Sequence, residues 1–191
     1  MANAAMSDEE FLSEYKNLLD NKQQLLNDFK TEYANVVEAG KFSGCLIYDI
    51  DANGVPEFFV NYTDYTNYEE GEDESVIYSI VNEKLVVVGH FQGVRFFAEK
   101  KVPGIILGIY GEIYPQFRYI YKNGILTELP DDYVSYPGGL EGNTVKVGDN
   151  VYDFNQESPI EDLFGNGNEF VYITGREHKD FQSAFESYEN N

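Results

Sequence analysis

The segment "YDIDANGVPEF", residues 48–58, has the residue types and the spacing of a cation-binding loop. Calcium takes about 6 to 8 oxygen ligands at roughly 2.3–2.6 Å, and a short loop can supply them from acidic and amide side chains at alternate positions before a glycine. Gly54 stands where that glycine belongs. The predicted ligands are the side chains of Asp49, Asp51, Asn53 and Glu57 and the main-chain carbonyl of Val55.

The same segment also fits an ordinary turn between two strands. In that interpretation Asn53 and Gly54 form a type I′ hairpin turn, and Asp49 and Asp51 point into solvent. A strand would place these two aspartates on one face about 7 Å apart, where a cation would offset their mutual repulsion. An EF-hand is excluded, because Val60 occupies the position of its bidentate glutamate and no helices flank the loop. Both interpretations stay open at this point.

Strand patterns on both sides of the loop must hold it in place. Asn123–Gly124 is the strongest two-residue hairpin signal in the chain, and Asn82–Glu83 marks a second tight turn. Consecutive hairpins of this kind predict an antiparallel meander and exclude a βαβ fold. The expected strands are 44–50, 55–61, 75–81, 84–91, 104–111, 116–122, 125–129 and 170–174.

Helical patterns lie at the two ends of the chain. Ser7 and Glu10 form a capping box, and apolar residues at steps of three and four predict a long helix from about 8 to 38. Lys22 interrupts the apolar stripe, so a bend or a two-helix hairpin near 21–24 is the alternative. Two further helices are expected, at 158–164 and 177–188.

These elements predict one α+β domain over residues 1–191. A long N-terminal helix would pack on an antiparallel meander sheet of about seven to nine strands, with a short helix and a C-terminal helix at the end. Residues 1–6 are expected to be disordered or to be a cloning remnant. The acidic block 69–74 has five acids among six residues, and we expect it to be a mobile loop in solvent because like charges repel.

The charge balance excludes two classes of partner. The chain has 34 acidic and 13 basic residues, which gives a formal net charge of -21. Nucleic acids and anionic membrane surfaces bind through clustered lysine and arginine, and the sequence has no basic patch. It also has no apolar run long enough to span a bilayer, so membrane insertion is not expected. The acidity fits a cation ligand, a basic protein partner, or solubility alone.

The sequence has no recognisable catalytic motif. Cys45 is the only cysteine, so neither an intramolecular disulfide nor a cysteine-based zinc cluster can form. His90 and His178 are the only histidines, and no nucleophile motif surrounds them or Cys45. We therefore expect a protein that is not an enzyme.

Two short elements carry a family resemblance. "LIYDIDANGVPEFFV" resembles the "YDIDGDGIPEL" element of uncharacterised exported proteins and lipoproteins of Gram-positive bacteria, and "YIYKNGILTEL" at 119–129 resembles a later element of the same proteins. The loop is also similar to the calcium loops of FG-GAP repeats in integrin-like propellers. The resemblance implies an exported protein with a structural calcium loop and no assigned reaction. Ala52 and Asn53 depart from the Gly and Asp of that family, the first residues show no leader pattern, and one loop does not make a propeller.

The resulting hypothesis is a non-enzymatic, exported or envelope-associated bacterial domain. Its calcium loop would be structural, its role would be binding or scaffolding of a protein or surface ligand, and it would be a monomer outside the cell or in the cell envelope. The alternative hypothesis is an acidic cytoplasmic protein that binds and neutralises a basic partner, as immunity proteins do.

Overall fold

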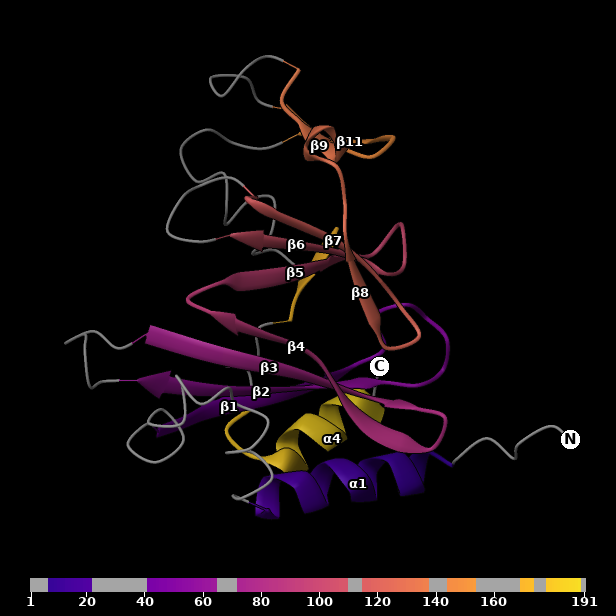
Figure 1. Ribbon diagram of the computed structural model, residues 1–191, viewed down its shortest axis with the longest axis vertical. Coiled ribbons are helices and arrows are strands. Elements are labelled where there is room, and N and C mark those ends of the chain that lie inside the picture. The colour runs from indigo at the N-terminus through magenta and orange to yellow at the C-terminus, as the bar shows by residue number, and fades with distance from the viewer. Residues whose placement is uncertain are drawn as a thin grey trace, which may run out of the picture.

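The computed structural model describes residues 7–21, 41–64, 72–109, 115–137, 144–153, 169–173 and 178–189 (Figure 1). These ranges contain two α-helices, one short 3₁₀ helix and twelve strands. The helices are α1 (Asp8–Asp20), α4 (Phe181–Glu189) and η2 (Asp131–Tyr133). The strands are β1 (Lys41–Tyr48), β2 (Glu57–Asp64), β3 (Glu72–Val81), β4 (Lys84–Gln92), β5 (Arg95–Glu99), β6 (Ile105–Ile109), β7 (Phe117–Lys122), β8 (Ile125–Glu128), β9 (Val134–Ser135), β10 (Thr144–Val147), β11 (Asn150–Asp153) and β12 (Phe170–Tyr172).

The strands pair only antiparallel, as the hairpin signals predict, and they form three sheets. The four-stranded sheet has the order β1-β2-β3-β4, and the five-stranded sheet has the order β12-β5-β6-β7-β8. The three-stranded sheet has the order β11-β10-β9. The α+β class therefore holds, whereas the prediction of one meander sheet is wrong.

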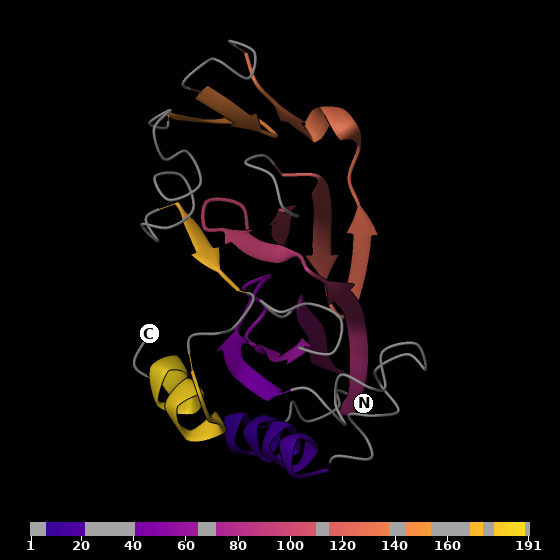
Figure 2. The ribbon, with the colours of Figure 1, turned by 90° about the vertical axis from the view of Figure 1, so that its left-hand side faces the viewer.

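The sheets and helices are stacked in layers along the long axis of the molecule (Figure 1). The helices α1 and α4 lie side by side on the outer face of the four-stranded sheet, as both ribbon views show (Figure 2). One core cluster, which includes Tyr15 and Phe58, fills the space between these helices and that sheet. A second cluster, around Phe59 and Phe96, joins the four-stranded and five-stranded sheets. A third, around Phe97 and Val145, joins the five-stranded and three-stranded sheets.

The N-terminal helix is shorter than the sequence pattern indicates. The predicted capping box is present, because the side chain of Ser7 accepts from the N–H of Glu10 and the Glu10 carboxylate accepts from the N–H of Ser7. The helix ends at Asp20, where the last turn has no basic side chain to favour the negative end of the dipole. Asn21 leaves the helical conformation and its N–H bonds to the carbonyl of Leu18. A single helix over 8–38 is therefore wrong, and residues 22–40 lie outside the described ranges.

The two tight turns lie where the sequence places them. Asn82 and Glu83, between β3 and β4, have φ angles of 51° and 62°, and Asn123 and Gly124, between β7 and β8, have 48° and 81°. Positive φ at both central residues is the signature of a type I′ turn, which matches the twist of the flanking strands. The turn residues therefore fix the register of both hairpins.

The acidic block does not lie wholly in solvent. β3 begins at Glu72, so the second half of the block is strand. The Glu74 side chain is buried, with 1% of its surface exposed, and its carboxylate lies 3.0 Å from the Nε2 of His90 on β4. Pairing with a strand and with a histidine outweighs the tendency of like charges to stay in solvent, so the prediction of a mobile loop is wrong for 72–74, and residues 69–71 lie outside the described ranges.

Some of the remaining predicted elements lie within the described residues and others lie outside them. A C-terminal helix and a strand before it are present as predicted, but α4 begins at Phe181 and not at 177, and β12 ends at Tyr172 and not at 174. The short helix expected at 158–164 and the proposed disorder of 1–6 lie outside the described residues. Within the described ranges, neither helix combines the length and the apolar character that crossing a membrane requires.

Candidate metal centre

The predicted cation loop is an eight-residue connection and not a two-residue turn. β1 ends at Tyr48, β2 begins at Glu57, and these two residues are paired across the strands. Positive φ angles occur at Ala52, 54°, and at Gly54, 86°, so the left-handed pair of a type I′ turn at 53–54 is absent. The tight-turn interpretation is therefore wrong. Since the strand stops at Tyr48, the alternation of side chains expected for Asp49 and Asp51 does not apply either.

Asp49 organises the loop from its first position. One carboxylate oxygen accepts from the N–H of Asn53 at 3.1 Å, and the other accepts from the N–H of Gly54 at 2.8 Å. The loop backbone thus bends back over the Asp49 side chain. Two N–H donors partly neutralise this carboxylate before any cation is considered.

Asp51 connects the loop to the β7–β8 hairpin. Its Oδ2 accepts from the main-chain N–H of Asn123 at 2.8 Å, across 72 positions of the sequence. Its Oδ1 is buried and has no hydrogen-bond partner. A buried oxygen that carries charge and has no donor is costly unless another group satisfies it. One oxygen of Asp51 is therefore anchored and the other is left free.

Glu57 is the first residue of β2 and its side chain is completely buried. Its Oε2 accepts from the N–H of Ile50 at 2.9 Å. Its Oε1 accepts from Ser79 on β3 at 3.1 Å and from the hydroxyl of Tyr121 on β7 at 2.6 Å. The Tyr121 hydroxyl also lies 2.9 Å from the Ser79 hydroxyl and accepts from the N–H of Gly124 at 2.9 Å. Both neighbouring sheets therefore hold this carboxyl group.

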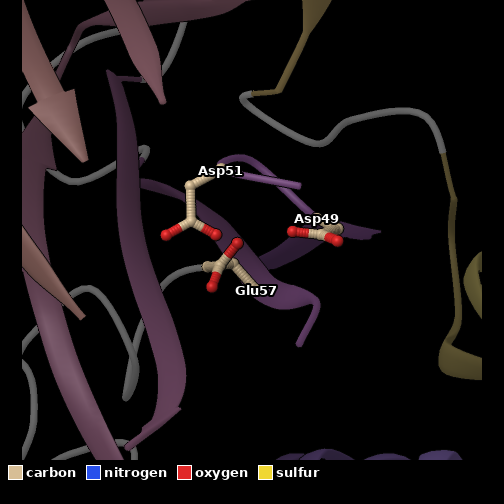
Figure 3. A group of neighbouring side chains, drawn as sticks. All are labelled: Asp49, Asp51 and Glu57. Atoms are coloured by element: carbon tan, nitrogen blue, oxygen red, sulfur yellow. The ribbon is translucent and has the colours of Figure 1, made fainter. Parts of the chain in front are cut away.

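The three acidic side chains converge on one point. Each of Asp49, Asp51 and Glu57 offers an oxygen, and these oxygens all lie within 4.8 Å of one another. Figure 3 shows the carboxyl groups of Asp51 and Glu57 turned toward each other, with Asp49 beside them. Three of the four predicted side-chain ligands are thus together.

The other two predicted ligands are placed differently. Asn53 is exposed, and its amide oxygen accepts from the N–H of Val55 at 2.7 Å, while its amide nitrogen lies 3.4 Å from the Asn123 side-chain oxygen. Asn53 therefore shapes the loop and contacts the hairpin. The Val55 side chain packs against the core under α1. The roles of the Asn53 oxygen and of the Val55 carbonyl as ligands stay predictions.

The rest of the fold holds both ends of the loop. The Tyr15 hydroxyl of α1 donates to the carbonyl of Pro56 at 2.6 Å, and the Tyr15 ring stacks on Phe58 with centroids 5.0 Å apart. At the other side, the N–H of Gly104 donates to the carbonyl of Ile50 at 2.8 Å. Gly104 has a φ of 92°, and a Cβ there would lie 2.5 Å from the carbonyl oxygen of Tyr121. Only glycine fits this close approach.

The buried surroundings change the proton affinity of the site. The pKa of Glu57 is raised to about 8, mainly by burial and also by the nearby charge of Asp51, while the hydrogen bonds from Tyr121, Ile50 and Ser79 oppose the rise. Burial also raises the pKa of Tyr121, and the charge of Glu57 adds to that shift. In general, two like unit charges about 5 Å apart repel by roughly 3 kcal/mol at an effective dielectric constant near 20. The cluster therefore favours taking up positive charge, either a proton or a cation.

The thiol and the imidazoles do not form a comparable site within the described residues. Cys45 is buried, and burial, with the charge of Asp180, raises the pKa of its thiol to about 12. His178 lies opposite Cys45 in an isolated β-bridge, in which the main-chain N–H of Cys45 donates to the carbonyl of His178 at 2.9 Å. His90 lies beside Glu74 on another part of the sheet. A neutral thiol is a poor nucleophile.

Sequence reasoning missed the residues that complete the site from a distance. Ser79, Gly104, Tyr121 and Asn123 come from strands and turns that are remote in the chain. For two of them, Tyr121 and Asn123, the one signal was the family resemblance, because it pairs the loop element with the "YIYKNGILTEL" element that contains both. Comparison with protein-family models, with curated proteins and with solved structures gave no match for this chain.

Proposed function

We propose that this protein is a non-enzymatic binding or scaffolding domain whose sheets are held together by one calcium ion in the 49–57 loop. The proposal is carried by the convergence of Asp49, Asp51 and Glu57, whose oxygens lie within 4.8 Å of one another, with the Asp51 Oδ1 buried and unpartnered. A cation at this point would satisfy that oxygen and remove the repulsion among three carboxylates.

The chemistry of the donors favours calcium over magnesium and over transition metals. All three side chains are carboxylates, and carboxylate oxygen is a hard ligand that suits calcium or magnesium better than soft metals. Magnesium requires a nearly ideal octahedron at about 2.0–2.1 Å and keeps much of its water. A loop of eight residues that includes the exposed amide of Asn53 offers irregular oxygen ligands, which calcium accepts.

The position of the cluster gives the ion a structural role. Asp49 and Asp51 lie in the loop after β1 and Glu57 begins β2, while Asp51 has a partner in the β7–β8 turn and Glu57 has one of its partners on β7. An ion bound to the three carboxylates would therefore strengthen the contact between the four-stranded and five-stranded sheets. The exported location and the surface ligand belong to the same proposal and rest on the family resemblance.

Thermal unfolding in three buffers tests the proposal: with EDTA, with calcium and with magnesium. An ion that binds only the folded state adds roughly 2.7 kcal/mol to the free energy of unfolding when its free concentration is about 100 times its dissociation constant. We expect calcium to raise the melting temperature of the wild type, and magnesium to raise it less. Identical melting curves in all three buffers would contradict the proposal.

The variant Asp51→Asn makes the test specific. It keeps one oxygen for the Asn123 N–H and replaces the other, unpartnered oxygen with an amide nitrogen that repels a cation. The variant should fold and lose the calcium-dependent gain. The matched control is Asp149→Asn, an exposed acid in the turn between β10 and β11, which should keep that gain. Equal responses of the two variants would show that the calcium effect arises elsewhere.

A second candidate function is the binding of a basic protein. It is favoured by the net charge of -21 and by the solvent-facing side of α1, which presents Glu9, Glu10, Glu14 and Asp20. A basic partner should co-purify with the protein and dissociate steeply as salt rises. Replacement of Glu9 and Glu14 by Gln should weaken that complex and leave the calcium response unchanged. Binding that does not depend on salt would exclude this candidate.

A further inference from the structure

A second buried carboxyl group lies between the five-stranded and three-stranded sheets. Glu99 is the last residue of β5, and only 2% of its surface is exposed. It pairs with Phe170 of β12 through the main chain. Its side chain meets Asn150 and Tyr152, which both belong to β11. A single carboxyl group therefore links the two sheets through polar contacts.

The two oxygens of Glu99 have different surroundings. Oε1 accepts from the Asn150 amide nitrogen at 2.9 Å and from the hydroxyl of Tyr152. Oε2 is buried and has no hydrogen-bond partner. If Glu99 is ionised, Oε2 is an unsatisfied anionic oxygen in the interior, which costs far more than an unsatisfied neutral hydroxyl. The neutral acid, with its proton on Oε2, keeps both hydrogen bonds to Oε1.

The charged groups around Glu99 compensate only part of this cost. Lys101 favours the anion, but its ammonium group already lies 2.9 Å from a Glu169 oxygen and 4.5 Å from the centre of the Tyr152 ring. Glu169 opposes ionisation. Beyond these, the hydroxyl of Tyr133 faces the charges of Glu99 and Asp149. No cation among the described residues makes an ion pair with Glu99 itself.

The three-stranded sheet depends on this contact more than a large sheet would. Its strands have two to four residues, and a sheet so small is not stable without packing on a neighbour. Its buried residues Val134, Val145, Val147 and Tyr152 pack against the face of the five-stranded sheet that contains Phe97 and Leu107. Tyr152, one of the two partners of Glu99 on β11, belongs to that packing.

We propose that Glu99 is a proton-controlled latch that holds β11, and with it the three-stranded sheet, on β5. With its proton bound the latch is closed, and loss of the proton places an unsatisfied charge in the interface and loosens the sheet. The interface thereby responds to pH independently of any ion in the 49–57 loop.

The direction of the response follows from the burial of Glu99. Burial raises the pKa of Glu99 above its ordinary value of 4.5, and the hydrogen bonds from Tyr152 and Asn150 lower it by less. The docked state therefore keeps its proton at pH values where the undocked state has lost it. Docking is strongest below about pH 4.5, weakens as pH rises toward the raised pKa of Glu99, and is constant above it.

Hydrogen exchange and carboxyl NMR, both measured in EDTA, test the latch. In the wild type the Glu99 carboxyl carbon should titrate above the ordinary range. Protection of the amides of Val145, Val147 and Tyr152, corrected for intrinsic exchange, should fall by up to about ten-fold per pH unit within that window. A Glu99 carboxyl that titrates at its ordinary value, or protection that does not change with pH, would overturn the proposal.

Two variants separate the latch from general loss of stability. Glu99→Gln puts a neutral side chain of the same shape at this position, so the amides of Val145, Val147 and Tyr152 should keep their protection at every pH. If their protection falls with pH as steeply as in the wild type, the proposal is overturned. In Tyr152→Phe, which removes one donor to the anion and keeps the ring, the Glu99 titration should move to higher pH, and a move to lower pH would overturn it. Because wild type and variants are compared at each pH, pH effects from other groups cancel.

Discussion

The carboxyl group of Glu57 and the hydroxyl of Tyr121 lie 2.6 Å apart and join β2 of the four-stranded sheet to β7 of the five-stranded sheet. Both side chains are buried, and each has further polar partners from other segments. Buried polar networks of this kind specify one arrangement of a core when every member is satisfied. The pair therefore fixes how the two sheets meet beside the candidate metal centre.

Tyr121→Phe should destabilise the protein by about 1–3 kcal/mol, since it leaves Glu57 Oε1 with one donor fewer in the interior. The loss would appear as a lower urea midpoint with an unchanged slope. Tyr119→Phe, on the same strand and only partly buried, is the control and should change stability by less than about 0.5 kcal/mol. Equal losses in the two variants would show that the Glu57 contact contributes nothing of its own.

Stability without calcium should depend on pH through Glu57. Its pKa is raised from 4.5 to about 8 in the folded state, so the folded protein holds a proton that the unfolded chain has released. The stability from this group is fully present below the unfolded value, declines as pH rises, and is gone once pH has passed about 8. Urea unfolding in EDTA at several pH values measures how the free energy of unfolding changes with pH, and Glu57→Gln should flatten that slope. An unchanged slope in that variant would assign the effect to other groups.

Two glycines provide a matched pair for testing how tightly the loop is docked. Gly54 and Gly104 both have positive φ, 86° and 92°, but a Cβ at Gly54 meets open space and one at Gly104 meets the Tyr121 carbonyl. Gly54→Ala should cost roughly 1–2 kcal/mol from backbone strain alone. Gly104→Ala should cost clearly more, as measured by urea unfolding. Similar costs would mean that the loop does not approach β7 closely.

The contact between the loop and the β7–β8 turn uses the main chain of Asn123. Asn123→Gly keeps the N–H that Asp51 accepts, and it tolerates the positive φ of 48°. This variant should therefore retain the calcium-dependent rise in melting temperature. If the rise disappears, the Asn123 side chain takes part in the site, and the main-chain account of the contact is wrong.

Local signals in the sequence predicted the parts of the fold that local interactions decide. The Ser7–Glu10 capping box, the I′ turn at Asn123–Gly124 and the convergence of the loop carboxylates all follow from residue types a few positions apart. The division into three sheets could not be predicted in this way, since it depends on which strands pack face to face. That choice is made by side chains far apart in the sequence.

The same distinction explains the errors within the site. The Asp51–Asn123 contact spans 72 positions of the sequence, and the spacing of apolar and polar residues within single helices or strands cannot predict a contact over that separation. The spacing of the loop predicts Glu57 as a ligand, but it does not predict that Glu57 is buried between Ser79 and Tyr121. The Asn53 oxygen accepts from the Val55 N–H, as is common for asparagine in turns, and its role as a ligand stays a prediction.

Equilibrium dialysis of the EDTA-treated protein against calcium tests the central claim most directly, because it counts bound ions without relying on stability. The wild type and Asp149→Asn should each bind one ion per chain in a saturable manner, and Asp51→Asn should bind none at the same concentrations. Absence of saturable binding to the wild type, or equal binding by Asp51→Asn, would contradict the assignment of a calcium site to Asp49, Asp51 and Glu57.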